Sequence, residues 1–172
     1  MIGICLTVCS SICAIRPDQI QWHYRLGTDP ADKNVLYSLL SLGAIKGEIS
    51  DDFEQVRRNW ICRHAGAVVV PVIIRQPLYE REPESKMIFV WIVDGRENLN
   101  VELVRRGCVA AAAMFSNRDR AFNGIDLPLE AAKDRLEVSE KAVRERLLQA
   151  EAHAHEAKAG IWAPAAQNRR DD

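Results

Sequence analysis

The sequence predicts one domain of the α+β class, in which runs of strands and of helices follow one another. Three apolar stretches typical of strands come first, over residues 2–15, 20–26 and 35–42, with no helical pattern between them. The two strongest strand signals, residues 68–74 and 87–93, follow a short helical stretch. Two further helical stretches complete the chain. Three strands thus precede the first helical stretch, and this order is typical of the α+β class.

The composition fits a single globular domain. The chain has 172 residues, of which 48% are apolar and 27% are charged, and this excludes collagen-like, low-complexity and wholly disordered proteins. Lysine and arginine number 23 against 24 acidic residues, which gives a formal net charge of −1. Binding of nucleic acid or of an anionic membrane would therefore depend on a local patch.

The N-terminal stretch, residues 2–15, is apolar but too short to span a bilayer, because Arg16 and Asp18 follow it. It also lacks the positive charge that precedes the apolar region of a secretory signal. We therefore expect no transmembrane segment and a cytoplasmic location. The alternative is secretion or export, with residues 2–14 acting as a signal segment.

The chain has five cysteines, an odd number that is too sparse for a disulfide framework, so reduced thiols are expected. Cys5, Cys9 and Cys13 are spaced by four residues, which places them on one face of either a strand or a helix. Metal sites usually combine two cysteine pairs in turns. Packing in the core is therefore the preferred interpretation of these three residues.

Turn signals divide the first half of the chain. The first two strands are expected to join near residues 16–18, and a turn is expected at residues 27–30. Gly43 ends the third apolar run. Residues 50–52 supply helix-capping side chains, and apolar residues then recur at helical spacing until Gly66.

Pro71 marks its strand as an edge strand or as the site of a bulge, and an Asp-Gly turn follows residue 93. A helix is expected from Leu99 to Gly107, where the glycine is a plausible C-cap. Residues 108–115 are interpreted as a small-residue connection and residues 116–127 as a loop. The remaining predicted elements are a long helix over residues 128–160, with a possible break near Asp134, and a polar tail over residues 164–172.

Two motifs at a characteristic separation give a family resemblance. Residues 87–115, MIFVWIVDGRENLNVELVRRGCVAAAAMF, are similar to the strand, Asp-Gly turn and LN-x-x-LV-x-x-G-x-A helix of the staphylococcal nuclease, or thermonuclease-like, family. Residues 150–163, AEAHAHEAKAGIWA, resemble the closing signature of the same family. The resemblance implies a five-stranded OB-fold β-barrel with three helices over residues 1–163, followed by the tail.

Enzymes of this family hydrolyse DNA and RNA phosphodiesters with calcium, carboxylate ligands, a glutamate base and two arginines. In the metal loop, Asp18 matches one family aspartate. In the central motif, Ser38 stands at the arginine position, Gly43 at the metal aspartate and Lys46 at the glutamate. Lys86 stands at the second arginine, where it keeps the charge without the bidentate fork. A slip in alignment would instead bring Arg81 or the acids at positions 48, 51 and 52 toward the site.

This pattern implies a thermonuclease-like protein that has lost phosphodiesterase activity, a pseudoenzyme acting as a binding or interaction module. No cofactor is expected, because Asp18 alone cannot supply the six to eight oxygens that calcium takes. The expected partner is a protein or, weakly, a single-stranded nucleic acid. A possible ligand surface comprises Arg16, Trp22, Tyr24, Lys46 and Lys86, although a position of Trp22 in the barrel core is the more common arrangement.

Two alternatives stay open. One is an active calcium-dependent nuclease that hydrolyses DNA or RNA phosphodiesters. The other is a subunit whose barrel and helices serve only as an assembly surface.

Overall fold

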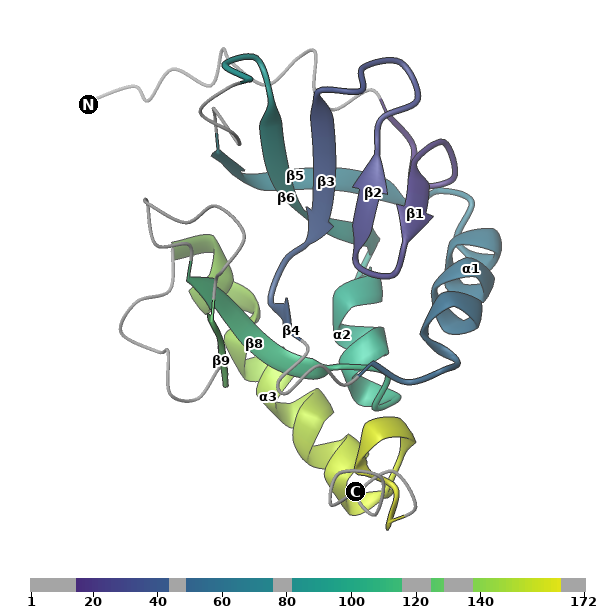
Figure 1. Ribbon diagram of the computed structural model, residues 1–172. Coiled ribbons are helices and arrows are strands. Elements are labelled where there is room, and N and C mark those ends of the chain that lie inside the picture. Colours follow the sequence, from purple (N-terminus) through teal and green to yellow (C-terminus); the bar gives the residue numbers. More distant parts are fainter. Residues whose placement is uncertain (1–14, 44–48, 76–81, 116–124, 129–137, 165–172) are drawn as a thin grey trace, which may run out of the picture.

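The computed structural model describes residues 15–43, 49–75, 82–115, 125–128 and 138–164 (Figure 1). The elements, in chain order, are β1 (Gln21–His23), β2 (Leu26–Thr28), β3 (Val35–Leu39), β4 (Leu42–Gly43), α1 (Phe53–Arg63), β5 (Val68–Arg75), β6 (Lys86–Asp94), β7 (Glu97–Asn98), α2 (Leu99–Arg105), β8 (Ala110–Phe115), β9 (Ile125–Pro128), α3 (Val138–Glu156) and the 3-10 helix η3 (Gly160–Trp162). The predicted α+β class is confirmed. No helix in these ranges is long and apolar enough to cross a membrane.

The larger sheet has six strands. Five follow the order β1-β2-β3-β6-β5, and β7 pairs with β6. β3 and β6 are parallel, whereas the other neighbours in this sheet are antiparallel. Within the described residues, β1 and β5 end the order and do not pair with each other, so the sheet is open there. Figure 1 shows β5 crossing behind β3 and β2, which gives the sheet its curvature.

The strand expected over residues 20–26 is instead a hairpin. β1 and β2 pair with His23 opposite Leu26, so that Tyr24 and Arg25 form a two-residue turn. Tyr24 has a φ of +48°, which is unusual for a residue other than glycine. The turn expected at residues 27–30 therefore begins later, because Gly27 and Thr28 belong to β2. The expected third strand is also interrupted, since it turns after Leu39 and continues in the second sheet as β4.

The helix α1 and the strands β5 and β6 lie where the sequence predicts them. The predicted capping at residues 50–52 is only partly correct: Asp52 is the N-cap residue, but its side chain caps no helical N–H. It accepts a hydrogen bond from the Ser50 hydroxyl at 2.5 Å instead. The pairing of β5 with β6 shifts between Pro71 and Ile73, so the predicted bulge is confirmed.

The prediction that residues 108–115 form a connection is wrong, because most of these residues form β8. This strand pairs with β4 on one side and β9 on the other, in a second sheet of three strands. Its first three residues are alanines that are almost completely buried. Alanine is a poor strand former by itself, so the strand depends on its neighbours in the sheet.

Four sequence expectations extend beyond the described residues. Of the loop predicted over residues 116–127, residues 116–124 lie outside the described part, and the rest belongs to β9. Pro128 ends β9 instead of opening a helix, and α3 is described from Val138 onward, so Asp134 lies outside. The strand expected over residues 2–15 and the tail expected over residues 164–172 also fall outside the description, except for Ile15 and Pro164.

A buried asparagine joins the helices to the larger sheet. Asn100, in α2, is fully buried, and its side-chain nitrogen donates to the carbonyl oxygens of Leu40 at 2.9 Å and of Val90 at 3.2 Å. Its side-chain oxygen accepts from the Ile92 N–H at 3.4 Å. One side chain thereby links α2, β6 and the turn after β3. The neighbouring Asn98 caps α2 by accepting from the N–H groups of Asn100 and Val101.

Two glycines bring the end of α3 against the end of α2. Gly107 and Gly160 have φ values of +67° and +54°, and the Gly107 carbonyl accepts from the Ile161 N–H at 2.9 Å. A β-carbon at either glycine would collide with the backbone of the other segment. The predicted C-terminal role of Gly107 is confirmed, and both glycines are required by close backbone approach.

Asn100→Ala tests this joint. We expect the free energy of unfolding to fall by about 3 kcal/mol, because two carbonyl groups and one N–H group would be left buried without this partner. Urea denaturation provides the measurement. The matched control is Asn59→Ala at an exposed position of α1, with an expected change of at most about 0.5 kcal/mol. Equal losses in the two variants would contradict the proposed role of Asn100.

Candidate functional site

Ser38, at the position of a phosphate-binding arginine in the resembling family, belongs to the core. It lies in β3, is 0% exposed, and its hydroxyl has no hydrogen-bond partner within the described part of the chain. Its neighbours on adjacent strands are Leu26 and Phe89. A serine in this apolar environment is unable to present charge to a ligand in solution.

Lys86, the other residue expected to contact phosphate, faces the opposite side of the sheet. It pairs with Val35, three residues before Ser38 along β3. Successive strand residues alternate between faces, so an odd separation places Lys86 and Ser38 on different faces. They are also about 10 Å apart along the strand direction. The structure therefore does not bring the two positions together.

The expected metal positions within the described residues supply few ligands for calcium. Gly43 is buried in β4 and has no side-chain ligand atom, while Lys46 lies outside the described residues. The Asp18 carboxylate is paired with Arg16 at 3.1 Å. In the described ranges, no group of three or more His, Cys, Asp or Glu side chains is arranged to hold a metal ion. The residues present at these positions do not fit calcium, which requires several oxygen ligands.

The expected ligand surface is also dispersed. The Trp22 side chain is half-buried, and its indole N–H donates to the Pro17 carbonyl at 2.9 Å, so it has a structural role. Arg16 also donates to the Ala65 carbonyl at 3.4 Å. Tyr24 is exposed, but it lies at the β1–β2 turn and is separated from the strand of Lys86 by β2 and β3.

The turn at Tyr24 is held by two residues that the sequence did not identify. Glu54 in α1 accepts from the Tyr24 N–H at 2.7 Å, and the buried Arg57 donates to the Tyr24 carbonyl at the same distance. Arg57 and Glu54 also pair at 2.9 Å. The hydrogen bond from Tyr24, supported by Arg57, holds the pKa of Glu54 below its ordinary value. This pair stabilises the unusual backbone of the hairpin.

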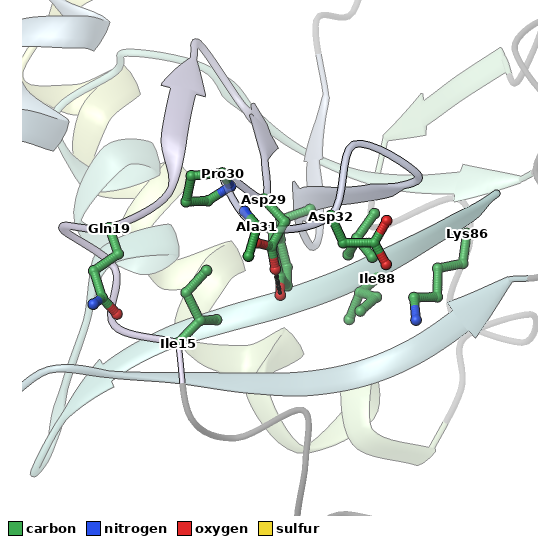
Figure 2. A pocket seen from close by; sticks show the side chains of 10 residues that line it. Ile15, Gln19, Asp29, Pro30, Ala31, Asp32, Lys86 and Ile88 are labelled. Carbon is green, nitrogen blue, oxygen red and sulfur yellow. Dashed lines mark hydrogen bonds between the residues drawn. The ribbon is translucent and has the colours of Figure 1, made fainter. Parts of the chain in front are cut away.

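A hollow of about 420 Å³ lies beside β3 and β6 (Figure 2). Figure 2 shows Ile15 and Gln19 on one side of it and Lys86 on the other, with the loop after β2 between them. The lining residues are Ile15, Gln19, Asp29, Pro30, Ala31, Asp32, Val35, Tyr37, Lys86 and Ile88. Among the described residues that the sequence singled out for a ligand surface, only Lys86 lines this hollow.

The polar groups of the hollow are partly committed to local contacts. The Tyr37 hydroxyl donates to one Asp29 carboxylate oxygen at 3.1 Å, and the other oxygen accepts from the Ala31 N–H at 2.8 Å. Asp32 accepts from the Asn34 N–H at 3.0 Å. Burial raises the pKa of Tyr37, and Asp29 raises it further, so its phenol is a neutral donor.

The charge of the hollow disfavours phosphate. Asp29 and Asp32 contribute two negative charges, and Lys86 contributes one positive charge. The Lys86 ammonium forms no ion pair within the part of the chain that the structure describes. The sequence signal for this site is the pair of acids three residues apart, of which only Asp29 falls in the turn predicted over residues 27–30.

Comparison of the chain with protein-family models, with curated proteins and with solved structures finds no match. The contacts and charges of the described residues are therefore the basis for the chemistry of the site.

Replacement of Tyr37 by phenylalanine tests the hydrogen bond in the hollow. We expect Tyr37→Phe to cost about 1 kcal/mol at neutral pH, because the Asp29 carboxylate loses a donor. The raised pKa in the folded state stabilises the protein below the ordinary tyrosine pKa of about 10, and this stabilisation is lost as the pH rises further. Between pH 8 and 11, the free energy of unfolding should therefore fall less with rising pH in Tyr37→Phe than in the wild type. The exposed Tyr24→Phe is the control, and an identical pH dependence in the two variants would refute the assignment.

Proposed function

We propose that this protein is a thermonuclease-like OB-fold domain that has lost phosphodiesterase activity and acts as a binding or interaction module. An OB fold is a five-stranded, partly open barrel. The described sheet supports this proposal. Its five main strands form one curved sheet in the order β1-β2-β3-β6-β5, and β1 does not pair with β5 within the described residues. The three α-helices of the described ranges agree with the same architecture.

The residues that carry the family resemblance also support the proposal. Asn100 of the first motif links α2 to β6, and Leu103 and Val104 are fully buried beside it. Gly107 and Gly160, from the two motifs, make the close backbone contact between the ends of α2 and α3. These residues have packing roles, so the motifs are signatures of a fold and carry no chemistry of their own.

The observation that carries the loss of activity is the placement of Ser38 and Lys86. Catalysis of phosphodiester cleavage needs fixed cations around the phosphate where charge develops. Here one position is a buried serine, and the other is a lysine on the opposite face of the sheet. No phosphate is able to contact both positions at once.

The partner that this charge distribution favours is a protein. The hollow carries a net charge of −1 from Asp29, Asp32 and Lys86, and the whole chain has the same formal net charge. A nucleic-acid ligand would be repelled by the two carboxylates, whereas a protein partner is able to supply complementary donors. The cytoplasmic location stays an expectation from the sequence, and tight binding of a single strand is the outcome that would overturn the assignment to a protein partner.

A nuclease assay tests the loss of activity. We expect purified protein to leave single-stranded DNA and RNA intact in the presence of calcium, because Ser38, Gly43 and Lys86 do not form a catalytic centre. Gel electrophoresis of labelled oligonucleotides provides the measurement. Cleavage that scales with protein concentration and disappears in Asp18→Ala would instead establish the alternative, a calcium-dependent nuclease.

Salt dependence tests the expected partner. The expected ligand residues include three cations, Arg16, Lys46 and Lys86, which together would give a log-log salt slope for a single strand of about −2 at most. The pairing of Arg16 with Asp18 makes the expected slope shallower. Fluorescence anisotropy with a labelled oligonucleotide at two salt concentrations measures it. Submicromolar affinity at physiological salt with a steeper slope would overturn the assignment to a protein partner.

A further inference from the structure

The hollow beside β3 and β6 carries charged groups of both signs. The carboxylates of Asp29 and Asp32 come from the loop after β2, and the ammonium of Lys86 comes from the first residue of β6 (Figure 2). Ile15 and Pro30 add apolar surface that is at least partly exposed. The volume of about 420 Å³ lies within the range of about 300–1,000 Å³ that is usual for small-molecule sites. The hollow is therefore a candidate site for a small ligand.

Backbone hydrogen bonds fix the loop that carries the carboxylates. The Asp29 N–H donates to the Val35 carbonyl at 3.1 Å, and the Val35 N–H donates to the Asp32 carbonyl at 3.0 Å. The Lys86 N–H donates to the Asn34 carbonyl at 2.8 Å, which fastens the loop to β6. A loop that is already ordered costs little additional conformational entropy when a ligand binds. The charged side chains are thus attached to fixed backbone before any ligand arrives.

The two carboxylates of the hollow differ in the contacts that they make. Both oxygens of Asp29 accept local hydrogen bonds, from the Tyr37 hydroxyl and from the Ala31 N–H. Asp32 accepts from the Asn34 N–H through one oxygen, and its other oxygen has no partner among the described residues. Burial raises the pKa of Tyr37, and the charges of Asp29 and Asp32 raise it further, so both charges act on the same part of the hollow. An entering cation would therefore meet a free acceptor at Asp32 and the added charge of Asp29.

Lys86 supplies a positive charge that the described residues do not neutralise. Its side chain is half-buried, and its ammonium pairs with neither Asp29 nor Asp32, although all three residues line the same hollow. A lysine ammonium is a compact point charge that binds a carboxylate in many orientations. A purely cationic ligand would be repelled by Lys86, and a purely anionic ligand would be repelled by the two acids. A ligand with one ammonium and one carboxylate satisfies both groups.

We propose that this hollow binds a small zwitterion, an α-amino acid with an aliphatic side chain. The ligand ammonium donates to Asp32 beside the charge of Asp29, and the ligand carboxylate accepts from the Lys86 ammonium. The aliphatic side chain packs against the apolar lining at Ile15 and Pro30. Both polar contacts join opposite charges, and the ligand adds no net charge. The proposal goes beyond the proposed function and does not rest on it, because it uses only the groups of this hollow.

Three related ligands test which charges the hollow recognises. L-leucine carries both charges, leucinamide lacks the carboxylate and N-acetyl-leucine lacks the ammonium, while the aliphatic side chain is the same in all three. Titration of the isotope-labelled full chain gives each dissociation constant from the NMR shifts of its backbone amides. We expect leucine to shift the amide signals of residues 29–34 and of Lys86. Leucinamide and N-acetyl-leucine should bind at least about tenfold more weakly, because each loses one hydrogen bond between charged groups.

Single substitutions assign each charge of the ligand to its partner. Asp32→Asn keeps an oxygen for the Asn34 N–H but removes the charge, and Lys86→Met keeps an aliphatic chain of similar length. We expect each variant to bind leucine about tenfold or more weakly. Lys86→Met should bind leucinamide no more weakly than the wild type does, because this ligand has no carboxylate to lose a partner. The matched controls, Lys33→Met and Asp51→Asn, remove exposed charges that do not line the hollow, and they should change leucine binding by less than about twofold.

Four results would overturn the proposal. Leucinamide that binds as tightly as leucine would show that the hollow takes the amino terminus of a peptide instead. N-acetyl-leucine that binds as tightly would show that the two acids play no part. Equal losses in the variants and the controls would show a general effect of charge. No amide shift up to the solubility limit of leucine would show that the hollow binds no ligand of this class.

The comparison of the three ligands uses the wild-type chain, so it decides the matter even where a variant fails to fold. Thermal unfolding of each variant shows which ones are folded. None of these measurements uses nucleic acid or a protein partner, so a negative result leaves the proposed function to its own tests.

Discussion

The buried side chain of Asn100 is the contact on which the rest of the structure depends. Its three hydrogen bonds join α2 to β6 and to the carbonyl of Leu40, where the chain leaves β3. The turn at that point directs β4 into the second sheet, where it pairs with β8. Because these are hydrogen bonds to backbone groups in a dry core, apolar side chains of similar size would not satisfy the same groups. The position of α2 then brings Gly107 against Gly160 at the end of α3.

This arrangement is compatible with the proposed loss of a catalytic centre. The resembling family places its chemistry in the segment from the end of β3 onward. Here the same segment contributes a buried Ser38, the Leu40 carbonyl bonded to Asn100, and Gly43 paired with Ala110. These residues are used for packing and sheet pairing, and a charged side chain at position 38 or 43 would be buried without a partner.

The sequence predicted the elements whose signals are local. β5 and β6 are runs of β-branched and aromatic residues, and the Pro71 bulge follows from the missing N–H of proline. The hairpin at Tyr24 was missed because Glu54 and Arg57, some thirty residues away, impose its backbone conformation. The alanine-rich β8 was missed because its stability comes from neighbouring strands. Of the candidate site, Lys86 was identified, but the face it occupies depends on the register of β3 and β6, which no single strand encodes.

The most direct test of this account is the thermal unfolding of Gly43→Asp, which restores an acidic side chain at the expected metal position. Gly43 is buried in β4, so an added carboxylate would be desolvated without a partner, at a cost of several kcal/mol. We expect the unfolding midpoint to fall, with no recovery on addition of millimolar calcium. A midpoint that calcium restores to the wild-type value would show that this corner of the fold still forms a cation site and would contradict the account.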